Sequence, residues 1–411
     1  MQVGLSNLLC LLFSAVLPRT IFGLMSVSRG PPGPPIILVP GDGGSQVEAK
    51  LHKQTVVHYL CEKNTDDFFN IWLNIELLVP LVIDCWIDNM RLEYDNVTRT
   101  TSSPEGVEIR IPGFGNSTTV EWLDPSRASP GAYFKDIANT LVEMGYERNL
   151  SIRGAPYDFR RAPNENGQYF RDLKTLVEET YLLNDKQPVV LLAHSMGGPM
   201  SLHFLHGQTQ RWKDKYIRSL ITLSGAWGGS VKALKVFVVG DNLGSYVLRE
   251  STLKTEQITS PSLAWLMPSS LFWHGNEVLV QTDQKNYTVN DFEQFFNDIG
   301  YSVGWEMRKD VQKYSFEFTA PGVEVHCLHG YGVNTVESLV YKPGKFPDGY
   351  PEFTYGDGDG TVNKRSLEGC LQWKNAQKRR VFHQTFPAVD HMSILRDART
   401  LSYIKNLIPK L

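Results

Sequence analysis

Short apolar runs that alternate with amphipathic helical patterns constrain the fold of this chain more than any other feature of its sequence. Mainly apolar runs at 36–39, 189–192 and 220–223 have the length of buried strands. Between these runs, apolar residues recur at helical spacing over 133–144 and 173–181. Strands that alternate with amphipathic helices are typical of parallel βαβ units. We therefore expect an α/β fold built on a doubly wound sheet.

The segment Ala193-His194-Ser195-Met196-Gly197 directly follows the apolar run 189–192 and precedes a helical pattern. A serine between small residues on a sharp strand-to-helix turn is the signature of the nucleophile elbow of α/β-hydrolases. Ala193 stands where a glycine is usual, and it is small enough for the turn to close. The pattern predicts Ser195 as a nucleophile.

A serine nucleophile needs a base, and the base needs a carboxylate that orients it. In α/β-hydrolases the acid and then the histidine follow the serine along the chain. The glycine-rich turn at 356–360 offers Asp359 as the acid, with Asp357 as the alternative. His391 near the C-terminus is the expected base, with His383 as the alternative. The Asp-Gly-Asp-Gly pattern also resembles a calcium loop, but the other ligand positions are missing.

Acyl transfer also requires donors for the oxyanion that forms at the attacked carbonyl. One donor should be the backbone N–H of Met196, directly after the nucleophile. The loop Pro40-Gly41-Asp42-Gly43-Gly44 follows the first core strand, and Gly41 lets its backbone turn. We expect the Asp42 N–H to be the second donor, while an ordinary glycine turn is the alternative for this loop.

Two regions interrupt the alternation of strands and helices, and they suggest how the chain is divided. Residues 61–87 are dense in large apolar side chains, and the region after 231 holds many aromatic residues. We expect the latter to be a cap inserted into an α/β-hydrolase core, with 240–261 as its most mobile part. The expected parts are a leader at 1–29, core segments at 34–60, 88–230 and 324–411, a small disulfide-braced subdomain at 61–87, and a cap and lid at 231–323. Residues 88–130 fit either the core or the cap.

The N-terminus resembles a signal peptide, because an uncharged apolar run at 8–17 precedes the proline-rich stretch 31–35. An uncleaved anchor is the alternative. No other stretch has the length of a transmembrane helix, so we expect none. The formal net charge is −3 without a basic run, which argues against a nucleic-acid partner. A secretory route agrees with four N-glycosylation sequons, at Asn96, Asn116, Asn149 and Asn286.

The chain has five cysteines, of which Cys10 lies in the leader. The other four form an even set, which suits disulfides in an oxidising compartment. Three connectivities are possible. Pairing neighbours closes the two shortest loops, so we expect Cys61 to bond Cys85 and Cys327 to bond Cys370. Metal ligation is the alternative, but no C-x-x-C spacing supports it.

Several segments together carry a resemblance to a known family. They are Val-Pro-Gly-Asp at 39–42, the loop between Cys61 and Cys85, Arg-Gly-Ala-Pro-Tyr-Asp at 153–158, the elbow at 193–197 and Gly-Asp-Gly-Asp-Gly-Thr-Val at 356–362. They resemble the lecithin:cholesterol acyltransferase family over nearly the whole mature chain. The segments 84–89 and 160–167 are similar to the lysosomal phospholipase A2 branch of that family, which also makes 1-O-acylceramide.

The resemblance implies that Ser195, Asp359 and His391 form the triad, that Asp42 and Met196 supply the oxyanion donors, and that both disulfides form as above. Two positions depart from the family pattern. Gly198 stands where we expect asparagine, and the segment Gly225-Ala226-Trp227-Gly228-Gly229 lacks the proline of the family's Gly-Ala-Pro-Trp-Gly-Gly. Neither departure changes a residue of the triad. Both leave open which acyl chain and which acceptor the enzyme prefers.

The apolar segment 61–87 gains a use if the substrate is a membrane lipid. Exposed Trp and Leu side chains on a disulfide-braced projection would insert at the bilayer surface. We expect Trp72, Leu73, Leu77 and Leu78 to contact the membrane, and packing on the core is the alternative.

The expected reaction is ping-pong acyl transfer from a glycerophospholipid to water or a lipid alcohol such as ceramide, without a metal or organic cofactor. The enzyme would work in the lysosome lumen or outside the cell, peripherally bound to membrane. A sterol acyltransferase, a silent lipid-binding protein and a serine peptidase are the alternatives. The intact Ser195, Asp359 and His391 argue against a silent protein, and the apolar segment would have no evident use in a peptidase.

Overall fold

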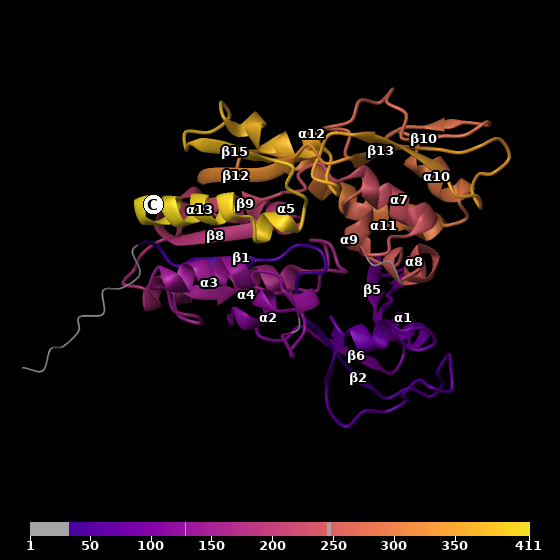
Figure 1. Ribbon diagram of the computed structural model, residues 1–411, viewed down its shortest axis with the longest axis horizontal. Helices are drawn as coiled ribbons and strands as arrows, with labels where there is room; N and C mark the ends of the chain where they lie inside the picture. The colour runs from indigo at the N-terminus through magenta and orange to yellow at the C-terminus, as the bar shows by residue number, and fades with distance from the viewer. Residues whose placement is uncertain (1–32, 128, 245–247) are drawn as a thin grey trace, which may run out of the picture. The chain divides into compact units, whose positions relative to one another are not determined.

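Six parallel strands form the central sheet of the protein (Figure 1). The computed structural model describes residues 33–127, 129–244 and 248–411. The strand order is β15-β12-β9-β8-β1-β7. The strands are β1 (Ile36–Val39), β7 (Ile152–Gly154), β8 (Val189–His194), β9 (Ile217–Leu223), β12 (Glu324–Tyr331) and β15 (Val381–Pro387). This sheet confirms the expected α/β fold.

Helices cover both faces of this sheet, which explains why its strands are apolar at successive positions. In β1, Ile36 and Leu38 belong to one buried cluster, and Ile37 and Val39 belong to another. Residues of α3 (Lys135–Glu143) and α13 (Ala398–Leu407) pack in the first cluster, and residues of α4 (Gly167–Leu183) and α5 (Gly197–His206) pack in the second. The helix α6 (Gln210–Tyr216) leads directly into β9. Each helical pattern expected from the sequence therefore places its apolar side against the sheet.

The apolar projection is built around a separate antiparallel sheet, and it includes more of the chain than residues 61–87. Its strands are β2 (Val47–Leu51), β3 (Phe69–Trp72) and β6 (Val107–Arg110), in the order β3-β2-β6. The strand β2 therefore comes from a range that we assigned to the core, and β6 comes from the range 88–130, which fitted either the core or the cap. The projection also contains η1 (Ile75–Leu78) and α1 (Ile83–Met90), and the hairpin β4 (Glu93–Asp95) to β5 (Thr100–Ser102) follows α1 along the chain.

The cap contains a third sheet, whose order is β11-β10-β13-β14. Its strands are β10 (Val280–Gln281), β11 (Asn286–Tyr287), β13 (Thr335–Val340) and β14 (Glu352–Gly356). Because β13 and β14 lie after residue 324, the expected boundary at 323 does not separate this sheet from the C-terminal core segment. The cap helices are α7 (Val231–Val239), α8 (Glu250–Gln257), α9 (Pro261–Trp265), α10 (Phe292–Asp298) and α11 (Ser302–Phe316).

Short helical elements complete the described part of the chain. They are α2 (Thr118–Glu121), η2 (Ser129–Gly131), α12 (Lys364–Leu367), η3 (Glu368–Trp373), η4 (Ser393–Leu395) and η5 (Ile408–Lys410). Disulfides join Cys61 to Cys85 and Cys327 to Cys370, which are the pairs with the shortest loops. Within the described residues, no helix has the length and apolarity needed to cross a bilayer. The expected leader at 1–29, including Cys10, lies outside the described residues.

The expected set of membrane-contacting residues is wrong at Leu78, which is buried beside α1 with 7% of its surface exposed. Trp72, Leu73 and Leu77 are half-buried and pack against the core, and the Trp72 indole N–H donates to the carbonyl of Gly43 at 2.8 Å. The run is apolar at nearly every position, so its pattern does not mark an inner and an outer side.

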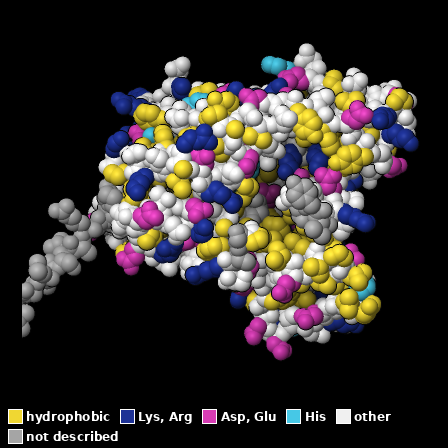
Figure 2. Space-filling model, in the orientation of Figure 1, with side chains coloured by type: hydrophobic (Ala, Val, Ile, Leu, Met, Phe, Trp, Pro, Cys, Tyr) yellow, Lys and Arg dark blue, Asp and Glu magenta, His cyan; other side chains and the backbone are white. Residues whose placement is uncertain are grey.

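The side chains that do face solvent belong to other residues of the same run. They are Ile75, Val79 and Leu81, which are 50%, 46% and 57% exposed. Val57, Tyr59 and Leu60 in the preceding loop are exposed as well. Figure 2 shows apolar side chains gathered on the projection that carries β2, β6 and α1 in Figure 1. We call these six residues the apolar face.

Candidate active site

Ser195 lies on the turn between β8 and α5 with a positive φ of 54°. This left-handed conformation is uncommon for a residue other than glycine and is typical of strained functional turns. The neighbouring chain leaves no room for a side chain at Gly197, since a Cβ there would lie 2.5 Å from the carbonyl oxygens of Val39 and Pro40. The small residue of the sequence motif is therefore required by close approach of the β1 loop to the elbow.

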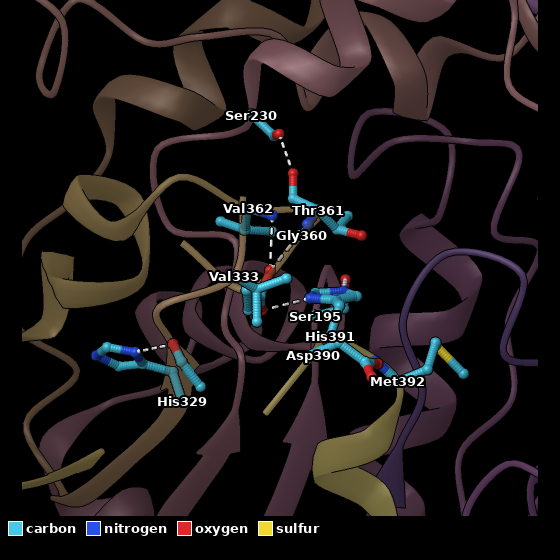
Figure 3. Close-up of polar contacts among 12 residues, drawn as sticks. Ser195, Ser230, His329, Val333, Gly360, Thr361, Val362, Asp390, His391 and Met392 are labelled. Carbon is cyan, nitrogen blue, oxygen red and sulfur yellow. Dashed lines mark hydrogen bonds and ion pairs between the residues drawn. The ribbon is translucent and has the colours of Figure 1, made fainter. Parts of the chain in front are cut away.

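Two loops from distant parts of the chain bring an acid and a base to Ser195. The Nε2 atom of His391 lies 2.8 Å from the Ser195 Oγ, and its Nδ1 lies 2.7 Å from Oδ2 of Asp359. His391 follows β15 and Asp359 follows β14, so each residue lies in a loop beyond the end of a strand. All three side chains are buried. Figure 3 shows Ser195 and His391 beside each other. The structure thus brings together the three residues expected from the sequence.

The second carboxylate oxygen of Asp359 accepts hydrogen bonds from the backbone of its own loop. The N–H groups of Val362 and Thr361 donate to Oδ1 at 2.8 Å and 3.1 Å. Burial alone would raise the pKa of Asp359, but the His391 imidazole and the hydrogen bonds hold that pKa below its usual value. Asp359 therefore stays ionised and can stabilise a protonated His391.

The two alternative residues lie elsewhere and have other partners. Asp357 accepts hydrogen bonds from the backbone N–H of Gly332 at 2.7 Å and from the Lys364 ammonium at 2.8 Å. The Nε2 atom of His383 on β15 lies 2.8 Å from Nε2 of His329. Neither alternative makes a hydrogen bond to the described triad residues, so the geometry favours Asp359 and His391.

A buried tyrosine and a second histidine support the triad, and sequence reasoning missed this role for both. The Tyr133 hydroxyl accepts from the Gly41 N–H at 3.0 Å and donates to Nδ1 of His194. The Nε2–H of His194 donates to the backbone carbonyl of His391 at 2.9 Å. Burial, together with the nearby His391, lowers the pKa of His194 to about 3, which keeps it neutral. These bonds link the loop after β1 to the loop that carries His391.

The expected oxyanion loop lies directly against the serine. A Cβ added to Gly41 would lie 2.6 Å from the Ser195 Cβ. Among the described residues, neither the Asp42 N–H nor the Met196 N–H donates a hydrogen bond within the protein. Asp42 is an exposed residue, and desolvation by the protein around its carboxyl group raises the pKa of that group to about 6.

The two departures from the family pattern contact one another beside the elbow. A Cβ on Gly198 would lie 3.3 Å from the Trp227 ring, and one on Gly225 would lie 2.8 Å from it. The Trp227 ring is buried and also packs edge-on against Trp373. A larger residue at 198 would have to displace this ring, so Gly198 and the altered 225–229 segment form one packing unit.

Comparison with known proteins decides the family. The sequence model of the lecithin:cholesterol acyltransferase family matches residues 68–398. A *Bos taurus* relative, "Lysosomal phospholipase A and acyltransferase", is 47% identical over 97% of this chain and 98% of its own. The chain belongs to the lecithin:cholesterol acyltransferase family. Its *Homo sapiens* relative of the same description is 48% identical over 91% of this chain and 90% of its own.

Another branch of the lecithin:cholesterol acyltransferase family is also similar to this chain. The *Gallus gallus* "Phosphatidylcholine-sterol acyltransferase" is 41% identical over 95% of this chain and 94% of its own. A chain of the crystal structure of the Tle4–Tli4 complex shares the fold, with a TM-score of 0.50 at 13% identity over 92% of this chain and 99% of that chain. With its α/β-hydrolase fold and this family membership, the chain is an enzyme of the serine-hydrolase type.

Proposed function

We propose that the protein is a phospholipase A and lipid acyltransferase that works through an acyl-enzyme on Ser195. The observation that carries the proposal is the continuous line of hydrogen bonds from Ser195 through His391 to Asp359. A neutral imidazole bonded to a serine hydroxyl can take its proton, and an ionised aspartate stabilises the imidazolium that results. The names of the bovine and human relatives support the same chemistry.

In the first half-reaction, the Ser195 Oγ attacks the ester carbonyl of a glycerophospholipid while Nε2 of His391 takes the hydroxyl proton. The negative charge moves to the carbonyl oxygen, where the N–H groups of Met196 and Asp42 would stabilise it. The carbonyl then re-forms, and the C–O bond to the glycerol breaks. His391 returns its proton to the departing oxygen, so lysophospholipid leaves and the acyl group stays on Ser195.

The second half-reaction reverses these roles with a new alcohol. Water or a lipid alcohol such as ceramide gives its proton to His391 and attacks the acyl carbonyl. Breaking the Ser195 ester returns the proton to Oγ and releases either a fatty acid or an O-acylated lipid. The triad itself does not choose between the acceptors, so the surfaces around it set the preference.

The apolar face supports a membrane-bound substrate. Ile75, Val79 and Leu81 expose about half of their surface on a projection that the disulfide Cys61–Cys85 braces. Exposed apolar groups clustered on one segment are typical of proteins that insert into a bilayer surface. We propose that the protein binds membranes peripherally through this face and takes glycerophospholipid from them.

We also propose that the protein acts in the lysosome lumen or after secretion. Two disulfides suit an oxidising compartment, and the bovine and human relatives are named lysosomal. Asn96, Asn149 and Asn286 are exposed and could carry glycans. Asn116 is half-buried, and its side chain accepts from the Thr118 N–H at 2.8 Å, so it is the least accessible of the four sequons.

The test is product analysis on liposomes that contain phosphatidylcholine with either a short-chain ceramide or cholesterol. We expect free fatty acid from both and O-acylated ceramide from the first. The Ser195→Ala variant should form neither product, although it should still bind the liposomes. Cholesteryl ester as the main product would instead assign the activity of the sterol branch. Labelling of the parent protein, but not of Ser195→Ala, by a fluorophosphonate probe checks the nucleophile independently.

A further inference from the structure

A second cluster of chemically reactive side chains lies outside the active site, between β12, β15 and η3. His329, His383 and Glu368 place their ligand atoms within 4.8 Å of one another. The two Nε2 atoms face each other at 2.8 Å. His329 is fully buried, while the other two residues are half-exposed, so the cluster opens to solvent on one side. The reaction proposed above uses no atom of this cluster.

The topology explains why these three residues meet. In the parallel pair β12–β15, Cys327 lies opposite His383, and His329 follows Cys327 by two positions. Residues two apart on a strand share a face, so both histidines project from the side of the sheet that carries Cys327. The disulfide from Cys327 to Cys370 holds η3 over that side, and Glu368 precedes Cys370 by two residues.

The hydrogen bonds of His329 prepare it as a ligand. Its Nδ1 lies 2.8 Å from the carbonyl oxygen of Gly330, so Nδ1 must carry the proton (Figure 3). The lone pair is then on Nε2, which points to His383. A metal-binding histidine is normally oriented in this way by a hydrogen bond from its other ring nitrogen to a carbonyl or carboxylate. Within the described residues, the carboxylate of Glu368 accepts no hydrogen bond and remains available.

We propose that His329, His383 and Glu368 form a site for a divalent transition-metal ion such as Zn²⁺. Two imidazoles and one carboxylate, with a further position open to water, are a known ligand set for this ion. Ligands at a tetrahedral zinc are about 3.3 Å apart. The two Nε2 atoms, which lie 2.8 Å apart, must therefore separate by about 0.5 Å, and the carboxylate, which lies within 4.8 Å of them, must approach by up to about 1.5 Å. On binding, His383 gives up the Nε2 proton that it shares with His329 and carries its proton on Nδ1 instead.

The bound ion would join the two segments that carry the acid and the base of the triad. Glu368 follows Asp359 by nine positions, and His383 precedes His391 by eight positions. The bound ion would therefore have a structural role, because it would hold the two loops of the triad together. Its binding should make the folded protein more resistant to heat.

The experiment measures thermal unfolding of the full chain at pH 7.0 with and without ZnCl₂. Saturating zinc should raise the Tm of the parent by about 3 °C, because an ion that binds only the folded state stabilises it. His383→Gln and Glu368→Gln should lose this shift. Glu324→Gln is the matched control, because Glu324 also lies beside a histidine of β12, at 3.0 Å from Nε2 of His326. It should keep the full shift.

Cobalt(II) provides a readout that a nonspecific stabilising effect would not give. Co²⁺ should show visible d–d absorption in the parent and in Glu324→Gln, and these bands should be absent in His383→Gln and Glu368→Gln. If zinc does not change the Tm of the parent, or if it shifts both site variants as much as the parent, the proposed site is wrong. These outcomes are independent of the phospholipase proposal, because neither measurement involves substrate or Ser195.

Discussion

The serine elbow and the apolar face show opposite patterns of burial. Around Ser195, the strands β1, β8 and β9 have buried apolar side chains on both sides of the sheet, and the serine itself is only 8% exposed. On the projection, Ile75, Val79 and Leu81 leave large apolar surfaces in water. Such exposure is unfavourable unless another surface covers it. The elbow is therefore buried within the protein, whereas no surface of the described residues covers the apolar face, and we propose that the membrane does.

The two disulfides reflect the same difference. Cys327 and Cys370 are buried and lie within a region that the central sheet already orders. The Cys61–Cys85 bond closes a loop with a sequence separation of 24 residues in the projection, where several apolar side chains face solvent. The Cys61–Cys85 bond therefore braces the part of the chain that carries the exposed apolar side chains. Chemistry and membrane capture should accordingly be separable by mutation.

The largest effect is expected at the acid of the triad. Asp359→Asn should lower kcat/KM for a soluble short-chain ester by about 10³–10⁴-fold, because an amide cannot stabilise the imidazolium of His391. Asp357→Asn, a change of the same kind two residues away, should alter kcat/KM by less than about threefold, since Asp357 bonds Gly332 and Lys364 instead. Steady-state kinetics of both variants check the assignment. A severe loss in Asp357→Asn with an active Asp359→Asn would exchange their roles.

Leu78 tests whether part of the projection belongs to the core. Because it is buried, Leu78→Ala should reduce the free energy of unfolding by about 2–4 kcal/mol. Liposome binding of the protein that remains folded should stay close to that of the parent. Chemical denaturation and vesicle flotation measure the two quantities. If stability is unchanged and liposome binding is weak, Leu78 contacts the membrane, as the sequence suggested.

Changes in the apolar face should weaken liposome binding and leave the stability of the fold nearly unchanged. Replacing Ile75 and Val79 together by serine should weaken liposome binding by about tenfold or more, because each side chain loses roughly 1 kcal/mol of transfer free energy. Activity on the soluble ester and the Tm should change little. Leu182→Ser with Leu183→Ser is the matched control, since these leucines are also exposed but lie at the end of α4. If the control pair weakens binding equally, exposed apolar side chains promote liposome binding wherever they lie, and the apolar face is not the specific membrane contact.

The smallest effect concerns Glu256 on α8, a helix that packs against α1 of the projection. Burial raises the pKa of Glu256 to about 8, although Arg160 opposes the shift and Asp42 and Asp158 add to it. A raised pKa means that the folded state holds the proton more tightly. This contribution to stability is complete below about pH 4.5 and is lost as the pH rises through about 8.

Glu256→Gln keeps a neutral side chain at every pH. It should therefore have a higher Tm than the parent at pH 8, by about 2–4 °C, and the same Tm at pH 4.5. Glu293→Gln, at an exposed position of α10, should show no such difference. Melting curves of the parent and both variants between pH 4.5 and pH 8 measure this difference in Tm. A difference of equal size at both pH values would mean that Glu256 acts through packing alone.

The sequence by itself determined the features that depend on neighbouring residues. The apolar run before Ser195 and the small residue after it specify a strand, a sharp turn and a helix, and all three are present. The acid and the histidine could be named because α/β-hydrolases place them in loops of fixed order along the chain. The pairing of Cys61 with Cys85 follows from closing the shortest loop. Each of these inferences needs only a local pattern or a chain order.

The tertiary structure decided the features that depend on residues far apart in the chain. Tyr133 and His194 meet across 61 positions, and His329 and His383 meet across 54, so no local spacing marks either pair. The local pattern also did not decide which side of the segment 73–82 is exposed, because nearly every position is apolar. Leu78 is buried only in the folded chain, where η1 packs against α1. Hydrogen bonds and burial are set by which surfaces meet in the folded chain, and a one-dimensional pattern contains that information only where neighbours along the sequence are also neighbours in space.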